Sequence, residues 1–315
     1  MEAEGGEGLR DINFVICSFD KPNSLQASIE SIIQYVKGFD YVMTVMYDVS
    51  DKPDSAKPLY EKLPKMYDNI RLVPGTDNLI LTERNLGCNS IEARYHVEMD
   101  DDVLVQKDCI RNLYDTMERD AAIGIAVPLL PFRGSMFYLK QVAMLPEELM
   151  KKLIDNDDIR KDLPELQKWY EENVYVPRNP KIKSDYVELF ELSLMMKCEK
   201  MKPLGCFDWD EYLDTGRSAC HANEELMIRL DAANMKVAVV NTAMALHCHH
   251  SRFKKDPRWG DGVHLADAHF KEKVGNKIGL CKKRLETNLT ANYRYKWKSA
   301  MLNMPRGCPD TMPTM

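Results

Sequence analysis

The chain has 315 residues, of which 44% are hydrophobic and 29% charged, and its formal net charge at pH 7 is −6. This length and composition allow a large buried core, arranged either as one large α/β domain with additions or as two domains. The negative total gives no support for general nucleic-acid binding. No stretch approaches 18 uninterrupted apolar residues, and the acidic N-terminus does not resemble a signal peptide, so we expect no transmembrane segment. The nine cysteines are odd in number and form no Cys-x-x-Cys pair, which favours reduced thiols in a cytoplasmic protein.

Strand-like and helix-like segments alternate along the first quarter of the chain. Residues 13–17 and 41–46 are short apolar strands, and residues 25–36 between them have apolar side chains at helical spacing. A proline-containing helix and a strand at residues 70–73 continue the pattern. This order predicts a mostly parallel sheet flanked by helices. Ligands of such sheets bind at the carboxyl ends of the strands.

Further elements are predicted down to residue 250. They are a short helix at 90–94, a strand at 95–99, an amphipathic helix at 108–119, and strands at 123–127 and 237–246. Residues 144–183 are charged and are predicted to form a helical insertion. The expected organisation is a disordered N-terminus (1–10), one domain (11–252), a basic extension packed on it (253–303) and a disordered tail (304–315).

The sequence Asp100-Asp101-Asp102 follows the strand at 95–99 directly. Three adjacent carboxylates repel one another unless a counter-charge is present. Mg²⁺ and similar cations bind to one or two protein carboxylates together with phosphate oxygens. An alternative interpretation is an acidic turn exposed to water. The metal interpretation is favoured because Asp20 and Asp48 also fall at predicted strand ends, on the edge where a ligand would bind.

Taken together, six segments resemble the family 2 glycosyltransferases, which bind nucleotide-sugars on the GT-A fold. In chain order, the motifs that carry the resemblance are Asp20-Lys21-Pro22, Asp48-Val49-Ser50-Asp51, Asn85-Leu86-Gly87, Asp100-Asp101-Asp102, Gly205-Cys206-Phe207-Asp208, and Glu224-Glu225 with Arg229 and His247. The resemblance spans roughly residues 12–250. It implies an α/β GT-A fold, Rossmann-like, with a mostly parallel mixed sheet.

The resemblance implies a nucleotide-diphosphate-sugar donor, with a UDP-sugar favoured, and Mn²⁺ or Mg²⁺. The donor-binding residues would be Ser18, Asp20, Asp48, Asn85, Asp100 and Asp101, and the metal ligands would be Asp100, Asp102 and His247. The alternative for His247, and for the neighbouring His249 and His250, is a solvent-facing or core histidine. A neutral imidazole suits Mn²⁺ better than Mg²⁺.

The catalytic base is the point where the sequence departs from the family. The position of the family's usual catalytic Asp is occupied by Asn223, which cannot accept a proton as a carboxylate does. We expect Glu224 or Glu225 to take this role, with Asp208 and Asp210 as the other candidates. The alternative is that both glutamates only cap the first turn of a helix, where the helix dipole favours negative charge. The resemblance implies transfer of the sugar to an acceptor hydroxyl with inversion, the acceptor being a glycan, lipid, protein or modified nucleic acid.

Two rival functions follow from the same residues. A sugar-phosphate nucleotidyltransferase would need a glycine-rich loop after the first strand to hold a triphosphate, and the loop that begins at Ser18 has no glycine. A catalytically inactive binding or scaffold module is supported by Asn223.

The basic C-terminal region has nine Lys or Arg between residues 271 and 298. It is interpreted as a solvated helical face, a loop over the donor phosphates, or a contact with an anionic surface.

Overall fold

The computed structural model describes residues 9–47, 54–75, 80–129, 193–204, 233 and 235–247. The strands are β1 (Arg10–Ser18), β2 (Tyr41–Tyr47), β3 (Ile70–Pro74), β4 (Ala93–Asp100), β5 (Val103–Val105), β6 (Ile123–Leu129), β7 (Ser193–Lys197) and β8 (Lys236–His247). The helices are α1 (Pro22–Tyr35), α2 (Lys57–Tyr60), α3 (Leu63–Met66), α4 (Ile80–Asn89), α5 (Cys109–Arg119) and α9 (Cys198–Met201), followed by a 3₁₀ turn, η2 (Lys202–Leu204).

The eight strands form one mixed sheet in the order β3-β2-β1-β4-β7-β6-β8-β5. The first four strands of this order are mutually parallel. β7 runs antiparallel to both β4 and β6, β8 is parallel to β6, and β5 is antiparallel to β8. The predicted mostly parallel mixed sheet is therefore confirmed. Ser18 pairs with Tyr47 and Cys17 with Asp100, so β1, β2 and β4 end at the same edge.

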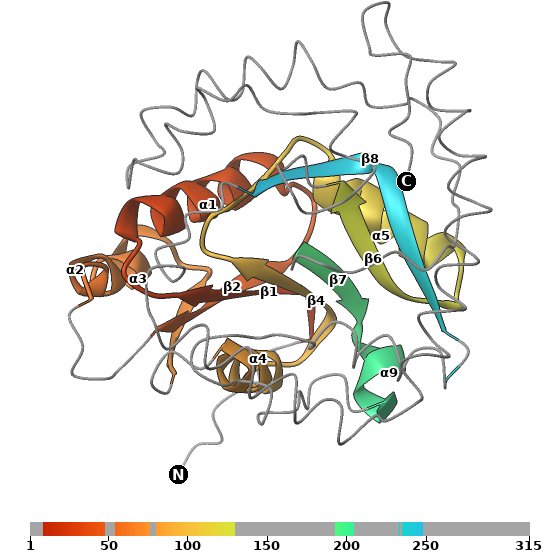
Figure 1. Ribbon diagram of the computed structural model, residues 1–315, viewed down its shortest axis with the longest axis horizontal. Coiled ribbons are helices and arrows are strands. Elements are labelled where there is room, and N and C mark those ends of the chain that lie inside the picture. The colour runs from red at the N-terminus through yellow and green to blue at the C-terminus, as the bar shows by residue number, and fades with distance from the viewer. Residues whose placement is uncertain are drawn as a thin grey trace, which may run out of the picture.

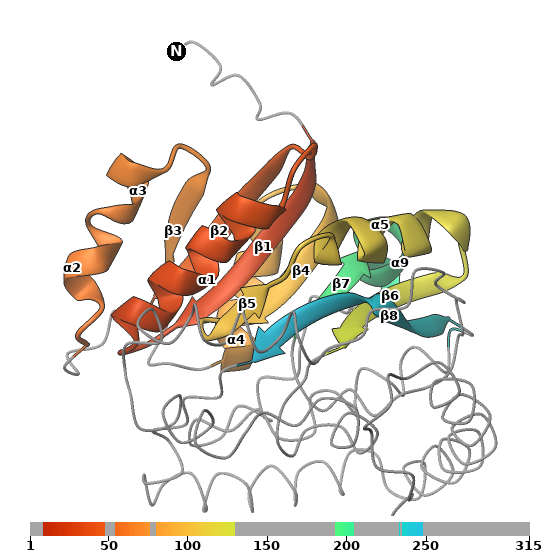
Figure 2. The ribbon, with the colours of Figure 1, turned by 90° about the horizontal axis from the view of Figure 1, so that it is seen from above.

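Helices cover both faces of the sheet (Figures 1 and 2). α1 and α5 lie on one face, and α4 and α9 on the other. Even-numbered residues of β1, such as Phe14 and Ile16, belong to a large apolar core that includes Leu25, Ile29 and Ile32 of α1. This is the face that the apolar spacing of residues 25–36 predicts.

The other face is built differently from the prediction. We expected Asn85-Leu86-Gly87 to precede a short helix at 90–94, but these residues lie inside α4, and residue 93 already begins β4. The reason is packing. A Cβ at Gly87 would lie 2.5 Å from Val15 Cγ1, so only glycine lets α4 approach β1 this closely. The Asn-x-Gly sequence therefore forms a helix–sheet contact rather than a helix start.

Several predicted features lie outside the described residues. These are residues 1–8, the insertion at 144–183, the basic extension at 253–303 and the tail at 304–315. β1 begins at Arg10, one residue before the expected start of the domain. In the part of the chain that the structure describes, no helix is long and apolar enough to cross a membrane.

Candidate functional site

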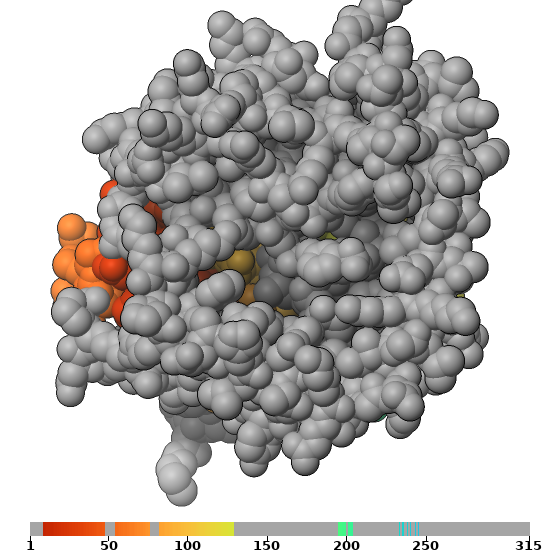
Figure 3. All heavy atoms as spheres, in the orientation of Figure 1, coloured from red at the N-terminus to blue at the C-terminus, as the bar shows by residue number. Residues whose placement is uncertain are grey.

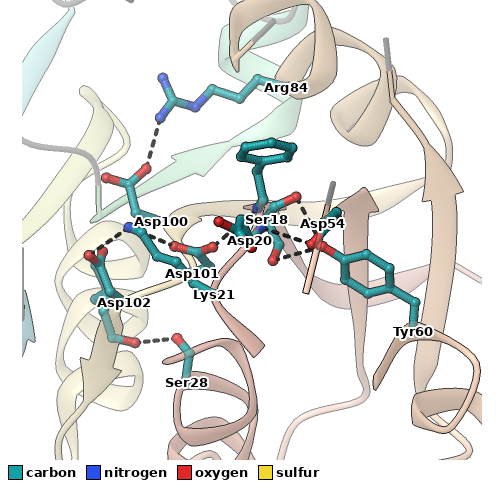
Figure 4. A network of polar contacts seen from close by, with 12 residues as sticks. Ser18, Asp20, Lys21, Ser28, Asp54, Tyr60, Arg84, Asp100, Asp101 and Asp102 are labelled. Carbon is teal, nitrogen blue, oxygen red and sulfur yellow. Dashed lines mark hydrogen bonds and ion pairs between the residues drawn. The ribbon is translucent and has the colours of Figure 1, made fainter. Parts of the chain in front are cut away.

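The acidic turn, residues 100–102, joins β4 to β5 at the edge where the parallel strands end. Asp100 is partly exposed, whereas Asp101 and Asp102 are buried. Helix α1 fixes the start of β5 because Ser28 Oγ donates to the carbonyl of Val103 and Ser31 Oγ accepts from Val105 N at 3.0 Å. The turn is therefore held against α1 by two buried serines, of which Figure 4 shows Ser28.

Lys21, just before α1, supplies the counter-charge for the buried part of the turn. Its Nζ lies 3.3 Å from Asp101 Oδ1 and 3.0 Å from Asp102 Oδ2. Only 14% of the Lys21 side chain is exposed, so this is a largely buried ion pair. Such pairs are screened much less by salt than surface pairs.

Arg84 of α4 approaches the turn from the opposite face of the sheet. Its Nη2 donates to Asp100 Oδ1 at 3.2 Å, and its Nε lies 3.7 Å from Glu98 Oε2. Arg84 and Glu98 are both almost completely buried. Asp100 and the buried part of the turn are thus paired with different cations.

The loop after β1 connects the turn to the segment after β2. Phe19 N donates to Asp101 Oδ2 at 3.3 Å, and Asp20 N donates to Asp54 Oδ1 at 3.0 Å. Asp20 Oδ1 in turn accepts from both N and Oγ of Ser55, at 3.0 and 2.7 Å. Asp20 has a φ of +56°, a conformation that Asp tolerates better than most residues. Asp20 and the acidic turn therefore belong to one connected network.

The network carries more negative than positive charge. Burial raises the pKa of Asp101 to about 7; Lys21 opposes this rise, and Asp102 and Asp100 add to it. Burial alone would lower the pKa of Lys21, but Asp101 and Asp102 reverse this effect and raise it. Three carboxylates at the turn face Lys21 and Arg84, and Arg84 is shared with Glu98. The site therefore favours additional positive charge.

The chemistry of this donor set fits a hard divalent cation. Asp and Glu oxygens are the ligands that Mg²⁺ and Mn²⁺ prefer. Within the described residues, however, no three His, Cys, Asp or Glu side chains are grouped closely enough to hold a metal ion by themselves. The carboxylates of the turn would therefore need further ligands, such as phosphate oxygens.

The structure brings together most of the predicted site residues that it describes. Ser18, Asp20, Asp100, Asp101 and Asp102 lie in one network at the sheet edge (Figure 4). The backbone of His247 pairs with Val103, directly after the turn. Asn85 is buried in α4, next to Arg84. Asp48, Asp208, Asn223, Glu224, Glu225, His249 and His250 lie outside the described residues.

Sequence reasoning missed the two cations and Asp54. Lys21 was considered only as part of the Asp-Lys-Pro motif, and Arg84 was not singled out. The sequence did indicate that a counter-charge was needed, because adjacent carboxylates repel one another, but it did not indicate which residues supply it. Tyr60 also contacts this edge, with its hydroxyl 3.3 Å from Ser18 Oγ.

In the space-filling view, atoms with the colours of β4 and β5 are visible near the centre (Figure 3). The described residues that reach the surface of this view are mainly those of α2 and α3, at the left.

Residues 14–164 match the family model described as Glycosyl transferase family 2. This part of the chain is therefore similar to the family 2 glycosyltransferases. The matched region begins within β1 and extends past β6, so it contains the whole acidic turn. No curated protein matches the sequence at a significant level.

Solved structures resemble this chain in fold. TarS 1-349 of S. aureus in complex with UDP has a TM-score of 0.51 at 9% identity, covering 75% of this chain and 60% of that one. GalNAc-T7 with UDP, GalNAc and Mn²⁺ has a TM-score of 0.54 at 14% identity, covering 76% of this chain and 43% of that one. The chain thus spans less than two thirds of either neighbour. These likenesses show the GT-A fold, which the sequence resemblance implied.

Proposed function

We propose that this chain is a metal-dependent glycosyltransferase that moves a sugar from a nucleotide-diphosphate-sugar to an acceptor hydroxyl with inversion. The observation that carries the proposal is the acidic turn, with three carboxylates at the carboxyl ends of parallel strands in a family 2 domain. A UDP-sugar is the favoured donor, because both fold neighbours were solved with UDP.

The nucleoside would bind near the ends of β1 and β2. Carboxylates accept hydrogen bonds from a base N–H or from ribose hydroxyls, which suits Asp20 and Asp48. One oxygen of Asp20 is held by Ser55, so its carboxylate has a fixed orientation. Ser18 and Asn85 would contribute further polar groups to the donor site. Such fixed polar groups reduce the entropy that is lost when a ligand binds.

The diphosphate would bind at the acidic turn, with Asp100, Asp102 and His247 as ligands of Mn²⁺ or Mg²⁺. The divalent cation would stabilise the negative charge that develops as the diphosphate leaves. Arg84 orients Asp100 through the hydrogen bond to its Oδ1. The serines of α1 keep the start of β5, and so the turn, in place.

Glu224 or Glu225, with Asp208 as the reserve, would accept the proton of the acceptor hydroxyl. The attacking oxygen then approaches the anomeric carbon from the face opposite the leaving diphosphate, which gives inversion. A carboxylate positioned within hydrogen-bond reach typically contributes about 10²- to 10⁴-fold to rate. The acceptor that offers this hydroxyl is a glycan, lipid, protein or modified nucleic acid.

The proposal is tested by incubating the protein with UDP-, GDP- and dTDP-sugars, with and without Mn²⁺. A true donor present at 100 times its Kd adds about 2.7 kcal/mol of stability, and this shift should require Mn²⁺. The same donor should then be hydrolysed slowly, with UDP measured by ion-pair chromatography. The absence of both a shift and hydrolysis with all three classes of donor contradicts the proposal.

A second candidate is a nucleotide-sugar-binding module without turnover. It is favoured by Asn223, which stands where the family has a catalytic Asp. The two candidates differ in one result. The binding module gives the stability shift without hydrolysis, and substituting Asn223→Asp would then be expected to create turnover.

A further inference from the structure

The acidic turn already contains a cation of its own. The ammonium group of Lys21 lies between Asp101 and Asp102, at 3.3 and 3.0 Å from their oxygens. Both carboxylates are buried, and their side chains are only 6% and 3% exposed. A second cation that binds Asp102 must therefore share its carboxylate with Lys21 or displace it.

The ammonium group of Lys21 would also repel a second cation strongly at this position. Two positive charges a few ångströms apart repel each other far more in a partly buried site than in water. Divalent cations approach carboxylate oxygens to about 2.0–2.2 Å, closer than an ammonium does, so both cannot bind the same oxygens without crowding. Lysine is suited to exchange, since its long stem rotates readily.

We propose that Lys21 is a built-in counter-ion of the acidic turn that competes with the divalent cation. The turn then binds a metal ion only as Lys21 leaves it. The inference rests on the proposed function, since it concerns the same metal site. It also explains how two buried carboxylates are tolerated when no metal is bound, because an uncompensated buried charge is strongly destabilising.

The first test measures binding of Mn²⁺ alone, without nucleotide, by the electron paramagnetic resonance signal of free Mn²⁺. The variant Lys21→Gln should bind Mn²⁺ at least about tenfold more tightly than the unmodified chain, equivalent to about 1.4 kcal/mol. The matched control is Lys37→Gln, because Lys37 follows α1 on the exposed surface, where it donates to Ile33 O. This control should bind Mn²⁺ as the unmodified chain does. Equal or weaker binding by Lys21→Gln overturns the proposal.

A double variant identifies the site that gains affinity. Lys21→Gln with Asp102→Asn should lose the tighter binding, because the gain depends on the turn. Tight binding that persists in the double variant means that the ion binds elsewhere, and this also overturns the proposal.

A second measurement uses the unmodified chain, in case Lys21→Gln does not fold. Lysine acetylation by acetic anhydride is followed by mass spectrometry, with Lys37 as the internal reference. Saturating Mn²⁺ should increase the labelling rate of Lys21 several-fold relative to Lys37. An unchanged ratio at saturation overturns the proposal. None of these measurements uses a sugar donor, so failure of the proposed function, seen as no donor binding or hydrolysis, remains distinguishable from failure of this inference.

Discussion

The two faces of β4 are built from different kinds of side chain. Tyr95, Val97 and Met99 point into the apolar core on the α1 side. The alternate residues His96 and Glu98 are also completely buried, but they are polar and lie on the α4 side. There, His96 Nδ1 lies 3.0 Å from Asn13 Nδ2, and Glu98 accepts from Cys88 Sγ at 3.7 Å.

This difference separates the forces that fold the sheet from those that prepare the site. The α1 face contributes hydrophobic burial, which is not directional. The α4 face contributes hydrogen bonds and charges, which fix the positions of particular groups and are costly when one partner is lost. Asp100 is the point where the polar face reaches the sheet edge, through Arg84. Four predictions test this contrast, from the largest expected effect to the smallest.

The largest effect is expected from Arg84→Met. This change leaves the buried carboxylate of Glu98 without its guanidinium partner, and breaking a buried pair typically costs about 3–5 kcal/mol. Urea denaturation should show a loss of this size in the free energy of unfolding. Adding Glu98→Gln should restore part of it, because the uncompensated charge is then removed.

The control for Arg84→Met is Arg94→Met. Arg94 is also an arginine of the sheet region, but its side chain is 41% exposed and its partners Asp11 and Glu118 are at the surface. Exposed pairs contribute about 0–1 kcal/mol. If both variants lose the same small amount of unfolding free energy, the stability of the α4 face does not depend on the buried ion pair.

The second prediction concerns the acidic turn. Asp102→Asn should lower donor hydrolysis about 10²- to 10³-fold, equivalent to roughly 3–4 kcal/mol, as for the loss of a group that stabilises the leaving charge. The fold should persist, because Lys21 keeps its contact with Asp101. The measurement is steady-state UDP release, with the melting temperature recorded alongside. Asp115→Asn, at an exposed position of α5, is the control and should leave both unchanged. Near-normal hydrolysis by Asp102→Asn would remove the turn from the mechanism.

Most of the fold could be predicted from the sequence, because parallel strands and amphipathic helices leave periodic patterns. The helix α1 and strands β1, β2, β3, β6 and β8 lie close to their predicted positions. The strand β7 was not predicted, since Ser193–Lys197 is short and pairs with β4 and β6, which are distant in the sequence. Local patterns carry no information about such partners.

The site was predictable in part, for a related reason. Acidic residues at strand ends could be assigned to one edge from topology alone, as for Asp20 and Asp100. The identity of the cations could not be predicted, because Lys21 lies just before α1 and Arg84 lies on α4, and their partners depend on packing. Glu98 shows the limit most clearly, since a charged residue on a strand is normally assigned to the exposed face.

The third prediction tests the close contact of α4 with the sheet. Gly87→Ala places a Cβ 2.5 Å from Val15 Cγ1 and 3.1 Å from Met46 Sδ. Overpacking of this kind costs about 1–3 kcal/mol, partly offset by up to about 1 kcal/mol from the better helix propensity of alanine. The free energy of unfolding should fall by the difference.

The double variant with Val15→Ala should lose less than the sum of the two single changes, since the clash is then absent. Leu86→Ala, on the exposed side of α4, should change stability by less than about 0.5 kcal/mol. Additive losses in the double variant would mean that α4 can shift away from β1 at little cost.

The smallest effect, counted per pH unit, is expected from the titration of His96. Burial, together with the charge of Lys202, lowers the pKa of His96 to about 3, whereas an unfolded histidine titrates near 6.5. The folded chain therefore keeps His96 neutral while the unfolded chain takes up a proton as the pH falls below about 6.5. The contribution of His96 to stability is complete above that pH and is lost toward pH 3, at up to about 1.4 kcal/mol per pH unit.

His96→Gln keeps an acceptor for Asn13 Nδ2 and removes this titration. The difference in unfolding free energy between the two chains, measured by urea denaturation from pH 7 to pH 4, should therefore change with pH by this slope. Two parallel curves would show that His96 becomes protonated in the folded chain as readily as in the unfolded one, and the polar face of β4 would then not exclude charge from this position.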